Sequence, residues 1–445
     1  MNSEVESPDQ VPAAYREQRD KIAARSASVG VLGLGYVGLP LAVELARAGF
    51  RVTGIDIDAS KVSNIRAGKS YIPDVSSEEL AALVQSGRLS ATESYAALAS
   101  CDVVDICVPT PLRKTKDPDL SFILSAVEQI QRFLHPGMLV ILESTTYPGT
   151  TEELVLPRLA ESGLRVGEQF FLCYSPERVD PGTASYHTHN IPKVVGGVTK
   201  RCAELGALFY QQAIETVVPV SSTKVAEMVK LLENTYRSIN IGLANEMALL
   251  CDRMGIDVWE VIDAAATKPF GFMPFYPGPG LGGHCIPVDP FYLSWKAKMD
   301  GTTAYFIELA GRINSSMPQF VVQKIQSALN QRSLAVNGAR VHLLGVAYKR
   351  DVADTRESPA LDVMILLDRL GARLSYSDPH VPRISLNGLT CEAVPVFPAC
   401  RDAACVVLLT DHTAFDYAAI AQQSPLIVDS RNAFRDLPSP HIIKL

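Results

Sequence analysis

The sequence predicts an α/β fold in which two domains of alternating strands and helices are separated by a largely helical segment. Apolar strands alternate with helices from residue 29 onward, and the same pattern resumes near Gly338. Between them, residues 223–253 keep helical periodicity over roughly 30 residues, which exceeds the usual length of a globular helix. A chain of 445 residues is too long for one ordinary core, so two or three domains are expected.

The first strand–helix–strand unit carries a glycine-rich turn. The strand over residues 29–32 leads directly into Gly33, Gly35 and Gly38, and the next strand closes at Asp56. In such a unit the first glycine makes the turn, the second lets a pyrophosphate approach, and the third lets the helix pack on the strand. Asp56 would bond to a ribose hydroxyl and repel a 2′-phosphate, which indicates NAD rather than NADP. A tight turn followed by a surface acid is the alternative.

The remaining elements follow from the same patterns. Further strands of the first domain are predicted at residues 102–108, 138–142, 170–174 and 194–195, in a parallel, doubly wound sheet. After the long helix, helices are predicted at residues 258–265 and 303–316, separated by a loop over 268–290. The second α/β pattern predicts a helix at 359–370 and strands at 340–346, 373–376, 405–409 and 426–428.

The composition is that of an ordinary soluble enzyme. Hydrophobic residues make up 47% and charged residues 20% of the chain. The formal net charge of −7, without a long basic run, argues against nucleic acid as the main partner. No apolar run approaches the roughly 20 residues of a membrane span, so no membrane association is expected.

The cysteines and the N-terminus bear on the location of the protein. The chain has nine cysteines, an odd number, and no close pair has zinc-ligand spacing. This usage predicts a reduced, cytoplasmic protein without a disulfide framework, and we expect no metal. Residues 1–27 are polar and lack the apolar segment of a secretory signal, and we expect them to form a mobile tail.

One cysteine lies in a loop of unusual composition. Residues 280–290 read Gly-Leu-Gly-Gly-His-Cys-Ile-Pro-Val-Asp-Pro, so Cys285 is surrounded by glycines and prolines and Asp289 follows it. Glycines let the backbone approach a ligand closely, and a thiol held there can attack a carbonyl. Together with a hydride-accepting nucleotide, this predicts oxidation of an alcohol to an aldehyde, capture as a thiohemiacetal, oxidation to a thioester and hydrolysis to an acid. An inert buried cysteine is the alternative, and we interpret His284 as a structural or ligand-contacting residue rather than a base.

Two helix residues and one loop acid are candidates for the same chemistry. Lys230 and Asn234 are spaced i, i+4 and share one face of the long helix, where a lysine and an amide could stabilise an oxyanion. Glu177 lies in Ser-Pro-Glu-Arg just after a predicted strand, at the edge where open α/β sheets hold ligands. A solvated helix face and a charged loop surface are the respective alternatives.

Three further segments follow predicted strands. Thr145, in Glu-Ser-Thr-Thr, is placed to bind a ribose, a sugar or a water; capping of the next helix is the alternative. Lys349 and Arg356 supply positive charge after the first strand of the second α/β pattern, which suits a phosphate clamp. Arg431 follows another strand end of that domain.

Seven segments, in this order, give the chain a recognisable likeness. They are VGVLGLGYVGLPLA, VPTP, EST, SPER, KLLENTYRSINI, FYPGPGLGGHCIPVDP and AYKRDVADTRESPA. On these motifs the chain, from residue 28 to its end, resembles the UDP-glucose/GDP-mannose dehydrogenase family, and within it the bacterial UDP-N-acetylglucosamine 6-dehydrogenase branch.

The resemblance implies a three-part architecture. It implies a Rossmann domain that binds NAD over residues 28–218, a helical domain with the cysteine loop over 219–325, and a Rossmann-like domain that binds UDP over 326–445. The helical domain is used for dimerisation in the family, so a homodimer is expected, with a larger homo-oligomer as the alternative. A UDP-sugar is the implied substrate.

The resemblance also implies roles for the candidate catalytic residues. Cys285 corresponds to the family's catalytic thiol. Lys230 and Asn234 correspond to the pair that stabilises oxyanions and positions water, and Asp289 to the acid that helps to activate that water. Glu177 corresponds to the residue implicated in thioester hydrolysis.

Further positions are implied to contact the cofactor or the substrate, and Thr145 is implied to contact water or the cofactor. The implied cofactor-binding residues are Gly33, Gly35, Tyr36, Val37, Gly38, Asp56, Lys61, Thr110 and Thr145. The implied substrate-binding residues are Glu177, Arg178, Lys230, Asn234, Phe275, Tyr276, Gly282, His284, Lys349, Arg356 and Arg431.

Two departures from the family's pattern matter. UDP-glucose members usually have serine before the cysteine, whereas this chain has His284, as in the N-acetylhexosamine branch. The usual Ser-Thr-Val-Pro is Ser-Thr-Thr-Tyr-Pro here, which leaves the geometry around Thr145 open.

These inferences together predict an NAD-dependent, four-electron oxidation of UDP-N-acetyl-D-glucosamine at C6 to the uronic acid, for surface polysaccharide or lipopolysaccharide assembly. UDP-N-acetylmannosamine, UDP-N-acetylgalactosamine and UDP-glucose are alternative substrates for the same chemistry. A two-electron dehydrogenase of small hydroxy acids would need neither Cys285 nor a third domain. A non-catalytic nucleotide-sugar sensor is the remaining alternative, and the set of Cys285, Lys230, Asn234 and Asp289 argues against it.

Overall fold

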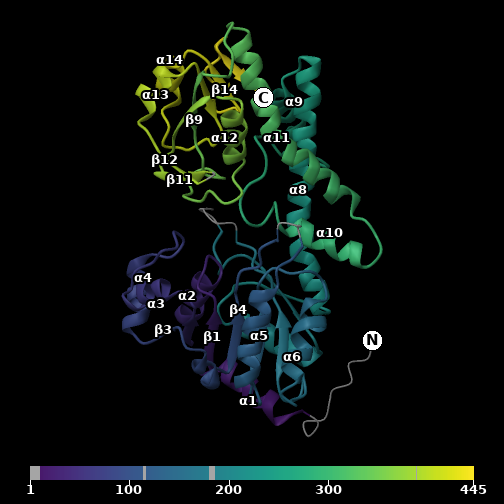
Figure 1. The fold of residues 1–445 in the computed structure, drawn as a ribbon. Helices are drawn as coiled ribbons and strands as arrows, with labels where there is room; N and C mark the ends of the chain where they lie inside the picture. The colour runs from purple at the N-terminus through teal and green to yellow at the C-terminus, as the bar shows by residue number, and fades with distance from the viewer. Residues whose placement is uncertain (1–10, 114–116, 180–185, 387) are drawn as a thin grey trace. The chain divides into compact units, whose positions relative to one another are not determined.

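The computed structural model describes residues 11–113, 117–179, 186–386 and 388–445, and it divides into two compact units, Met1–Leu232 and Glu233–Leu445. Each unit contains a mostly parallel sheet flanked by helices, and the longest helices lie in the middle of the chain (Figure 1). The predicted α/β fold is therefore confirmed. The three domain boundaries proposed from the sequence stay a prediction.

The first unit is built on an eight-stranded sheet of order β3-β2-β1-β4-β5-β6-β7-β8. Its strands are β1 (Ser28–Leu32), β2 (Arg51–Ile55), β3 (Leu89–Thr92), β4 (Val103–Ile106), β5 (Leu139–Leu142), β6 (Phe171–Tyr174), β7 (Lys193–Gly197) and β8 (Val217–Val220). β6 and β7 pair antiparallel, which corrects the expectation of a wholly parallel sheet in this region. β3 was not predicted because Ser90 and Thr92 interrupt its apolar pattern, and β8 was not predicted because Pro219 lies within it.

Helices cover both faces of this sheet because successive strand residues point to opposite sides. Val29 and Val31 of β1 pack in the core formed with α2 and α7, whereas Leu32 packs in the core formed with α5. The helical elements are α2 (Gly38–Ala48), α3 (Ala59–Arg66), α4 (Ser77–Gln85), η2 (Tyr95–Ser100), α5 (Ser121–Phe133), η3 (Thr151–Val155), α6 (Leu156–Ala160) and α7 (Lys200–Tyr210).

The N-terminal region contains a helix that the sequence analysis missed. The expected mobile tail over residues 1–27 is wrong for α1 (Ala13–Ala23), while residues 1–10 lie outside the described residues. Ile22 of α1 is fully buried in the core, and Gln18 donates a hydrogen bond to the carbonyl of Asp102. Two anchoring side chains in a polar helix are too weak a pattern to recognise without the sheet they contact.

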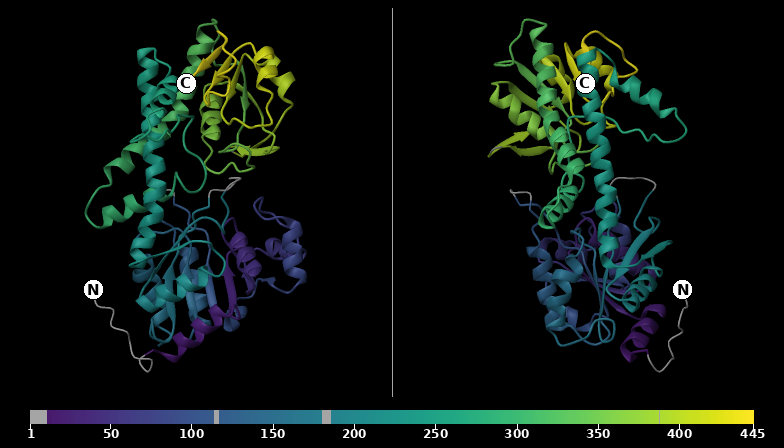
Figure 2. Two further views of the ribbon diagram at one scale, coloured as in Figure 1. Left: turned by 180° about the vertical axis from the view of Figure 1, so that it is seen from behind. Right: turned by 90° about the vertical axis from the view of Figure 1, so that its right-hand side faces the viewer.

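Four helices occupy the middle of the chain: α8 (Thr223–Met254), α9 (Val258–Ala266), α10 (Asp289–Met299) and α11 (Tyr305–Asn330). α8 runs as one long helix, as predicted (Figure 2). α11 continues beyond the predicted residue 316 and through Pro318, because Pro318 and Met317 are buried and their packing offsets the missing N–H bond. α10 was not predicted, and the loop expected over 268–290 is wrong for its last two residues, because Asp289 and Pro290 begin this helix, where proline is well tolerated.

The second unit contains a five-stranded parallel sheet of order β10-β9-β13-β14-β15. Its strands are β9 (Arg340–Leu344), β10 (Arg373–Ser377), β13 (Cys405–Leu408), β14 (Ile427–Asp429) and β15 (Ile442–Lys444); a hairpin adds β11 (Arg383–Leu386) and β12 (Leu389–Glu392). α11 and α12 (Pro359–Arg369) cover one face, and α13 (Val396–Asp402) and α14 (Tyr417–Gln423) the other. No helix in the described part of the chain is both long and apolar enough to cross a membrane.

Candidate active site

The glycine turn after β1 has the geometry that its three glycines predict. Gly33 has a φ of 89°, and a Cβ there would lie 2.6 Å from the carbonyl oxygen of Cys107. A Cβ on Gly38 would overlap the carbonyl oxygen of Gly33, so the start of α2 packs directly on the turn. A Cβ on Gly35 would meet no atom within 4 Å. The turn is therefore closed at its first and third glycines and open at the second, as a pyrophosphate requires.

Asp56 fastens this turn to the end of β2. Its Oδ2 accepts hydrogen bonds from the backbone N–H of Leu34 at 2.7 Å and from Lys61 Nζ at 3.1 Å, and its Oδ1 accepts the N–H of Asp58 at 2.9 Å. The carboxylate is thus held at the edge of the sheet beside the open turn. Tyr36 is exposed, and the other predicted cofactor residues, Val37 and Thr110, are half-buried. This arrangement fits NAD.

Thr145 lies half-buried in the segment after β5, whose neighbours are tightly bonded. Ser144 donates to the carbonyl of Val108 at 2.8 Å. Further along, Glu227 of α8 accepts hydrogen bonds from Gly149 N (2.5 Å), Thr151 N (2.9 Å) and Thr151 Oγ1 (2.7 Å). Burial raises the pKa of Glu227 to about 7, and these hydrogen bonds oppose the rise. The sequence analysis missed Glu227, because its partners lie far away in the chain.

Lys230 of α8 is bonded to the segment after β6. Its Nζ donates to the backbone carbonyl of Glu177 at 2.6 Å, and Lys230 is 9% exposed. The Glu177 carboxylate accepts the N–H groups of Arg178 and Val179 at 2.7 Å each and contacts Lys193 Nζ at 3.4 Å. Burial opposes ionisation of Glu177, but Lys193 and the backbone N–H groups outweigh it and lower its pKa. The alternative of a charged loop surface does not hold for this half-buried carboxylate, because both of its oxygens have partners within the protein.

Asn234 lies one helical turn after Lys230 and is 6% exposed, so the alternative of a solvated helix face is wrong at both positions. Asn234 Nδ2 donates to Asp289 Oδ2 at 2.6 Å. Asp289 is buried and is the first residue of α10. This hydrogen bond joins two of the residues proposed for the handling of water.

Cys285 lies just before α10, and its carbonyl accepts the N–H groups of Val288 (3.0 Å) and Asp289 (2.7 Å). Cys285 therefore lies in the turn that leads into α10. Cys285 is half-buried, whereas six of the nine cysteines are buried and burial raises their pKa values, for example to about 11 in Cys101 and about 12 in Cys405. Cys285 is thus not a core cysteine, and its role as the nucleophile stays a prediction.

The loop before Cys285 packs on segments of the C-terminal sheet. A Cβ on Gly282 would lie 2.6 Å from the Cβ of Tyr348, and Gly283 N donates to the carbonyl of Arg356 at 3.0 Å. A Cβ on Gly278 would lie 2.8 Å from an Nη atom of Arg431. The structure thus brings the cysteine loop close to the backbone of Arg356 and to the side chain of Arg431, and their role in substrate binding stays a prediction.

The basic groups of this region are already partly engaged. The Arg356 guanidinium makes a bidentate contact with Asp354, with bonds of 2.6–3.1 Å. Arg431 Nε donates to the carbonyl of Leu409 at 2.8 Å, and Lys349 is half-buried. A phosphate bound here would compete with Asp354 for Arg356.

The aromatic candidates face α8 and α9. The Tyr276 ring stacks on Trp259 with centroids 5.8 Å apart, and its hydroxyl donates to Asp263 at 2.8 Å. Phe275 makes an edge contact with Tyr236 at 5.8 Å. These side chains hold the start of the cysteine loop against the helices.

One cluster of an acid and two histidines lies outside the set of predicted site residues. Asp351, His380 and His412 place ligand-type atoms within 4.8 Å of one another, but both ring nitrogens of His412 are hydrogen-bonded, to Asp351 N and to Asp378. The prediction that no metal takes part stays a prediction.

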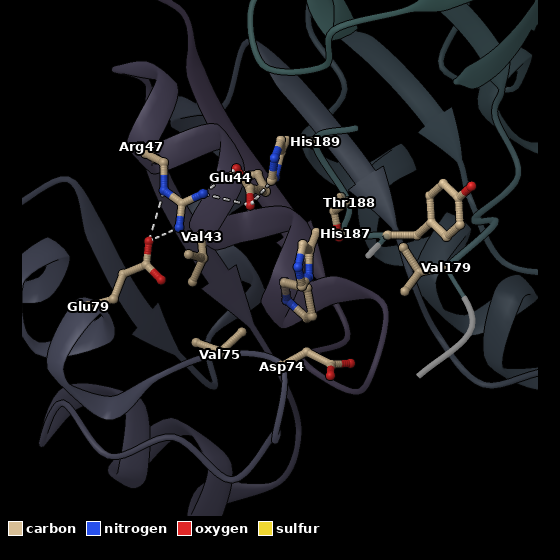
Figure 3. Close-up of a pocket in the computed structure, with 12 residues that line it drawn as sticks. Val43, Glu44, Arg47, Asp74, Val75, Glu79, Val179, His187, Thr188 and His189 are labelled. Carbon is tan, nitrogen blue, oxygen red and sulfur yellow. Dashed lines mark hydrogen bonds and ion pairs between the residues drawn. The ribbon is translucent and has the colours of Figure 1, made fainter. Parts of the chain in front are cut away.

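A cavity of about 220 Å³ lies on the outer side of α2, and none of the predicted site residues lines it (Figure 3). Arg47 is paired there with Glu44 and Glu79, and His189 lies 3.6 Å from Glu44. The cavity is therefore lined by a charged network that the proposed chemistry does not use.

Comparison with known proteins places these features in a family. Models of the UDP-glucose/GDP-mannose dehydrogenase family match residues 27–214 (NAD binding domain), 224–316 (central domain) and 342–436 (UDP binding domain). The chain is 42% identical over 355 residues to a UDP-N-acetyl-D-glucosamine 6-dehydrogenase of Pseudomonas aeruginosa, covering 79% of this chain and 83% of that protein.

A second group of relatives is named for a different substrate. The chain is 36% identical over 425 residues to a UDP-N-acetyl-D-mannosamine dehydrogenase of Pyrococcus horikoshii, covering 94% of this chain and 98% of that protein. The solved structure of a UDP-D-ManNAc dehydrogenase from the same organism matches with a TM-score of 0.86 and 34% identity, covering 94% of this chain and 98% of that one.

Proposed function

Because the chain belongs to the UDP-glucose/GDP-mannose dehydrogenase family and is an NAD-dependent UDP-sugar dehydrogenase, we propose that it oxidises UDP-N-acetyl-D-glucosamine at C6 to UDP-N-acetyl-D-glucosaminuronic acid. The reaction removes four electrons, and NAD, when bound, accepts a hydride in each of the two oxidations. The observation that carries the proposal is the Asn234–Asp289 hydrogen bond, which ties α8 to the helix that begins just after Cys285.

Cys285 supplies the nucleophile. The first oxidation removes the hydroxyl proton, through a water near Lys230 or Asp289, and leaves an aldehyde. Attack of the Cys285 thiolate forms a carbon–sulfur bond and an oxyanion, which Lys230 and Asn234 stabilise with their N–H groups. Departure of the second hydride from the same carbon leaves a thioester on Cys285.

Hydrolysis of the thioester needs a water and a base. We assign the base to Asp289, because its carboxylate is buried and held by Asn234. Water adds to the thioester carbon, its proton passes to Asp289, and the carbon–sulfur bond breaks to release the Cys285 thiolate. Glu177, whose pKa is lowered, is a weak proton acceptor; we assign it the task of holding Lys230, and Thr145 that of contacting water or the cofactor.

Two observations support the choice of sugar. The relative at 42% identity is a UDP-N-acetyl-D-glucosamine 6-dehydrogenase, and His284 precedes the cysteine as in the N-acetylhexosamine branch. UDP-N-acetyl-D-mannosamine is the second candidate, because a relative named for that substrate matches over a larger share of the chain. Lys349, Arg356 and Arg431 are proposed to hold the UDP phosphates and the sugar.

A homodimer is proposed from the surface of α8. Leu232, Tyr236, Leu243 and Leu250 are exposed and recur at spacings of four and seven residues, which gives an apolar stripe along one side of the helix. We also propose a cytoplasmic location, since the chain has an odd number of cysteines, nine, and no close pair with zinc-ligand spacing. A role of the product in surface polysaccharide or lipopolysaccharide assembly is proposed as well.

The test is a stoichiometry. Purified protein is mixed with excess NAD and limiting UDP-N-acetyl-D-glucosamine, and the NADH formed per sugar is counted. About two NADH per sugar is expected for the double oxidation. Cys285→Ser should abolish formation of the uronic acid. About one NADH per sugar with release of aldehyde would contradict the thioester scheme, and turnover with UDP-N-acetyl-D-mannosamine alone would select the second candidate.

A further inference from the structure

A group of buried polar side chains lies next to Glu177, at the carboxyl ends of the central strands of the first sheet. Asp105, Glu143, Lys193 and Tyr210 are each at most 4% exposed. The sequence analysis did not single out any of them. Burying such groups is costly unless they are paired, and a buried ion pair is weak evidence for stability alone. The position of these groups therefore needs another reason.

Lys193 is the only cation of this group and contacts two carboxylates. Its Nζ lies 2.9 Å from Glu143 Oε1 and 3.4 Å from Glu177 Oε2, and 4.9 Å from the centre of the Tyr210 ring. The Tyr210 hydroxyl lies between Glu143 and Asp105 and is 3.0 Å from Asp105. Burial, and then the charge of Glu143, raise the pKa of Asp105 well above its usual value. The close ionic contacts of Lys193 are those with the carboxylates of Glu143 and Glu177.

From Lys193 the contacts lead to a proposed catalytic residue. Glu177 Oε2 faces Lys193, its Oε1 accepts two backbone N–H groups, and its backbone carbonyl accepts Lys230 Nζ at 2.6 Å. The carboxylate of Glu177 is thus fixed on both oxygens. A rotation of this residue would move the carbonyl that holds Lys230.

We infer that Lys193, held by Glu143, is a positioning residue of the active site that fixes Glu177 and, through the Glu177 carbonyl, sets the place of the Lys230 ammonium group. The inference rests on the proposed function for the role of Lys230 in catalysis. Lys193 touches neither substrate nor cofactor in this role. Without it, the Glu177 carboxylate would lose the cation that lowers its pKa most, and the turn after β6 would lose a side-chain contact.

The test uses Lys193→Met/Glu143→Gln, which removes the cation and one of its anions together so that no unpaired Glu143 charge remains beside the deleted lysine. Lys193→Arg keeps the charge, and Lys200→Met, at an 88% exposed side chain on α7, is the matched control. We expect kcat to fall about 100-fold in the double variant, because misplacement of a catalytic group by about 1 Å has this effect. KM for NAD should stay unchanged, and Lys193→Arg should recover most of the loss.

A second readout does not depend on the substrate. The rate at which an N-hydroxysuccinimide ester labels Lys230 is measured by peptide mass spectrometry in the same variants. Lys230 should be labelled about tenfold faster in the double variant, because its hydrogen bond to the Glu177 carbonyl is lost. In Lys193→Arg and Lys200→Met it should be labelled at the wild-type rate. Unchanged labelling of Lys230 in the folded double variant would overturn the inference. If the wild type leaves UDP-N-acetyl-D-glucosamine unoxidised while the labelling changes as expected, the proposed function fails and the positioning of Lys230 stands.

Discussion

The two sheets of the molecule fasten the end of their first strand in the same way. After β1, the backbone N–H of Leu34 donates to Asp56, the acid that follows β2. After β9, the N–H groups of Val346 and Ala347 donate to Asp378, the acid that follows β10. In each unit, an acid at the end of the second strand therefore closes the turn after the first.

The two acids differ in what else they bind. Asp56 is joined otherwise by Lys61, whose side chain is 33% exposed, and by one N–H group. Asp378 accepts three further hydrogen bonds, from the fully buried His412 ring and from the N–H groups of His380 and Val381. Burial opposes ionisation of Asp378, but these hydrogen bonds outweigh it and lower its pKa. Asp56 thus has fewer hydrogen-bond partners within the protein than Asp378, and we predict that only Asp56 also binds a ribose.

The helices after the two turns differ as well. α2 begins at Gly38, directly behind the glycine turn, whereas residues 345–358 separate β9 from α12. Only the first turn therefore places a helix N-terminus next to the phosphate site. The second domain must hold a diphosphate with side chains instead, and its Lys349 and Arg356 lie in that intervening segment.

The largest effect on NAD affinity is expected from a methyl group added to the first turn. Gly38→Ala would push a Cβ into the Gly33 carbonyl, so the turn must open and NAD affinity should fall about 100-fold, or about 3 kcal/mol. Gly35→Ala meets no protein atom and should lower NAD affinity about tenfold while the melting temperature stays unchanged. Both are measured by NAD titration and thermal unfolding.

The matched control lies in the other sheet. Gly345 has a φ of 79°, and a Cβ there would collide with Thr410, so Gly345→Ala should destabilise the second unit. The affinity of the Gly345→Ala variant for NAD should equal that of the wild type. An equal loss of NAD affinity in Gly345→Ala and Gly38→Ala would show that the two turns do not have separate roles.

A smaller effect is expected from the two acids themselves. One oxygen of Asp378 accepts hydrogen bonds from Val346, Ala347 and His412, and the other accepts two N–H groups. Asp378→Asn replaces one of these two oxygens, so the free energy of unfolding should fall by about 3 kcal/mol without a change in NAD affinity. Asp56→Asn should do the reverse, with about tenfold weaker NAD binding and less than about 1 kcal/mol of lost stability. Urea unfolding and NAD titration measure both, and a large loss of NAD affinity in Asp378→Asn would refute the separation.

The sequence predicted those features that short-range spacing encodes. The glycine turn, the i, i+4 pair on α8 and the composition of the cysteine loop can each be recognised within a few residues. Lys193 and Glu227 could not be found this way, because each gains its role from partners on other strands and turns: Glu227 binds Thr151, and Lys193 binds Glu143. α10 could not be recognised either, because a proline at its second residue is compatible with the end of a loop and with the start of a helix.

The smallest effect concerns pH and compares Asp378 with a second buried carboxylate, Glu227 in the first unit. Glu227 also accepts turn N–H groups but contacts no cation among the residues that the structure describes, and burial raises its pKa from 4.5 to about 7. Folded protein therefore holds a proton that the unfolded chain releases, and stability from Glu227 falls as pH rises from about 5 to about 7, by about 2 kcal/mol. Asp378 has a lowered pKa, so its contribution is complete above 3.8 and is lost only in acid.

Free energies of unfolding of the wild type, Glu227→Gln and Asp378→Asn, measured by urea at several pH values from about 5 to about 8, separate the two cases. Glu227→Gln removes the titrating group, so the wild type should lose stability relative to this variant as pH rises through the window. The difference between the wild type and Asp378→Asn should stay constant there, because neither Asp378 nor asparagine titrates. A difference between the wild type and Glu227→Gln that is flat with pH would mean that Glu227 is ionised throughout, and that its three donors suffice without a cation, as the backbone N–H groups and His412 do for Asp378.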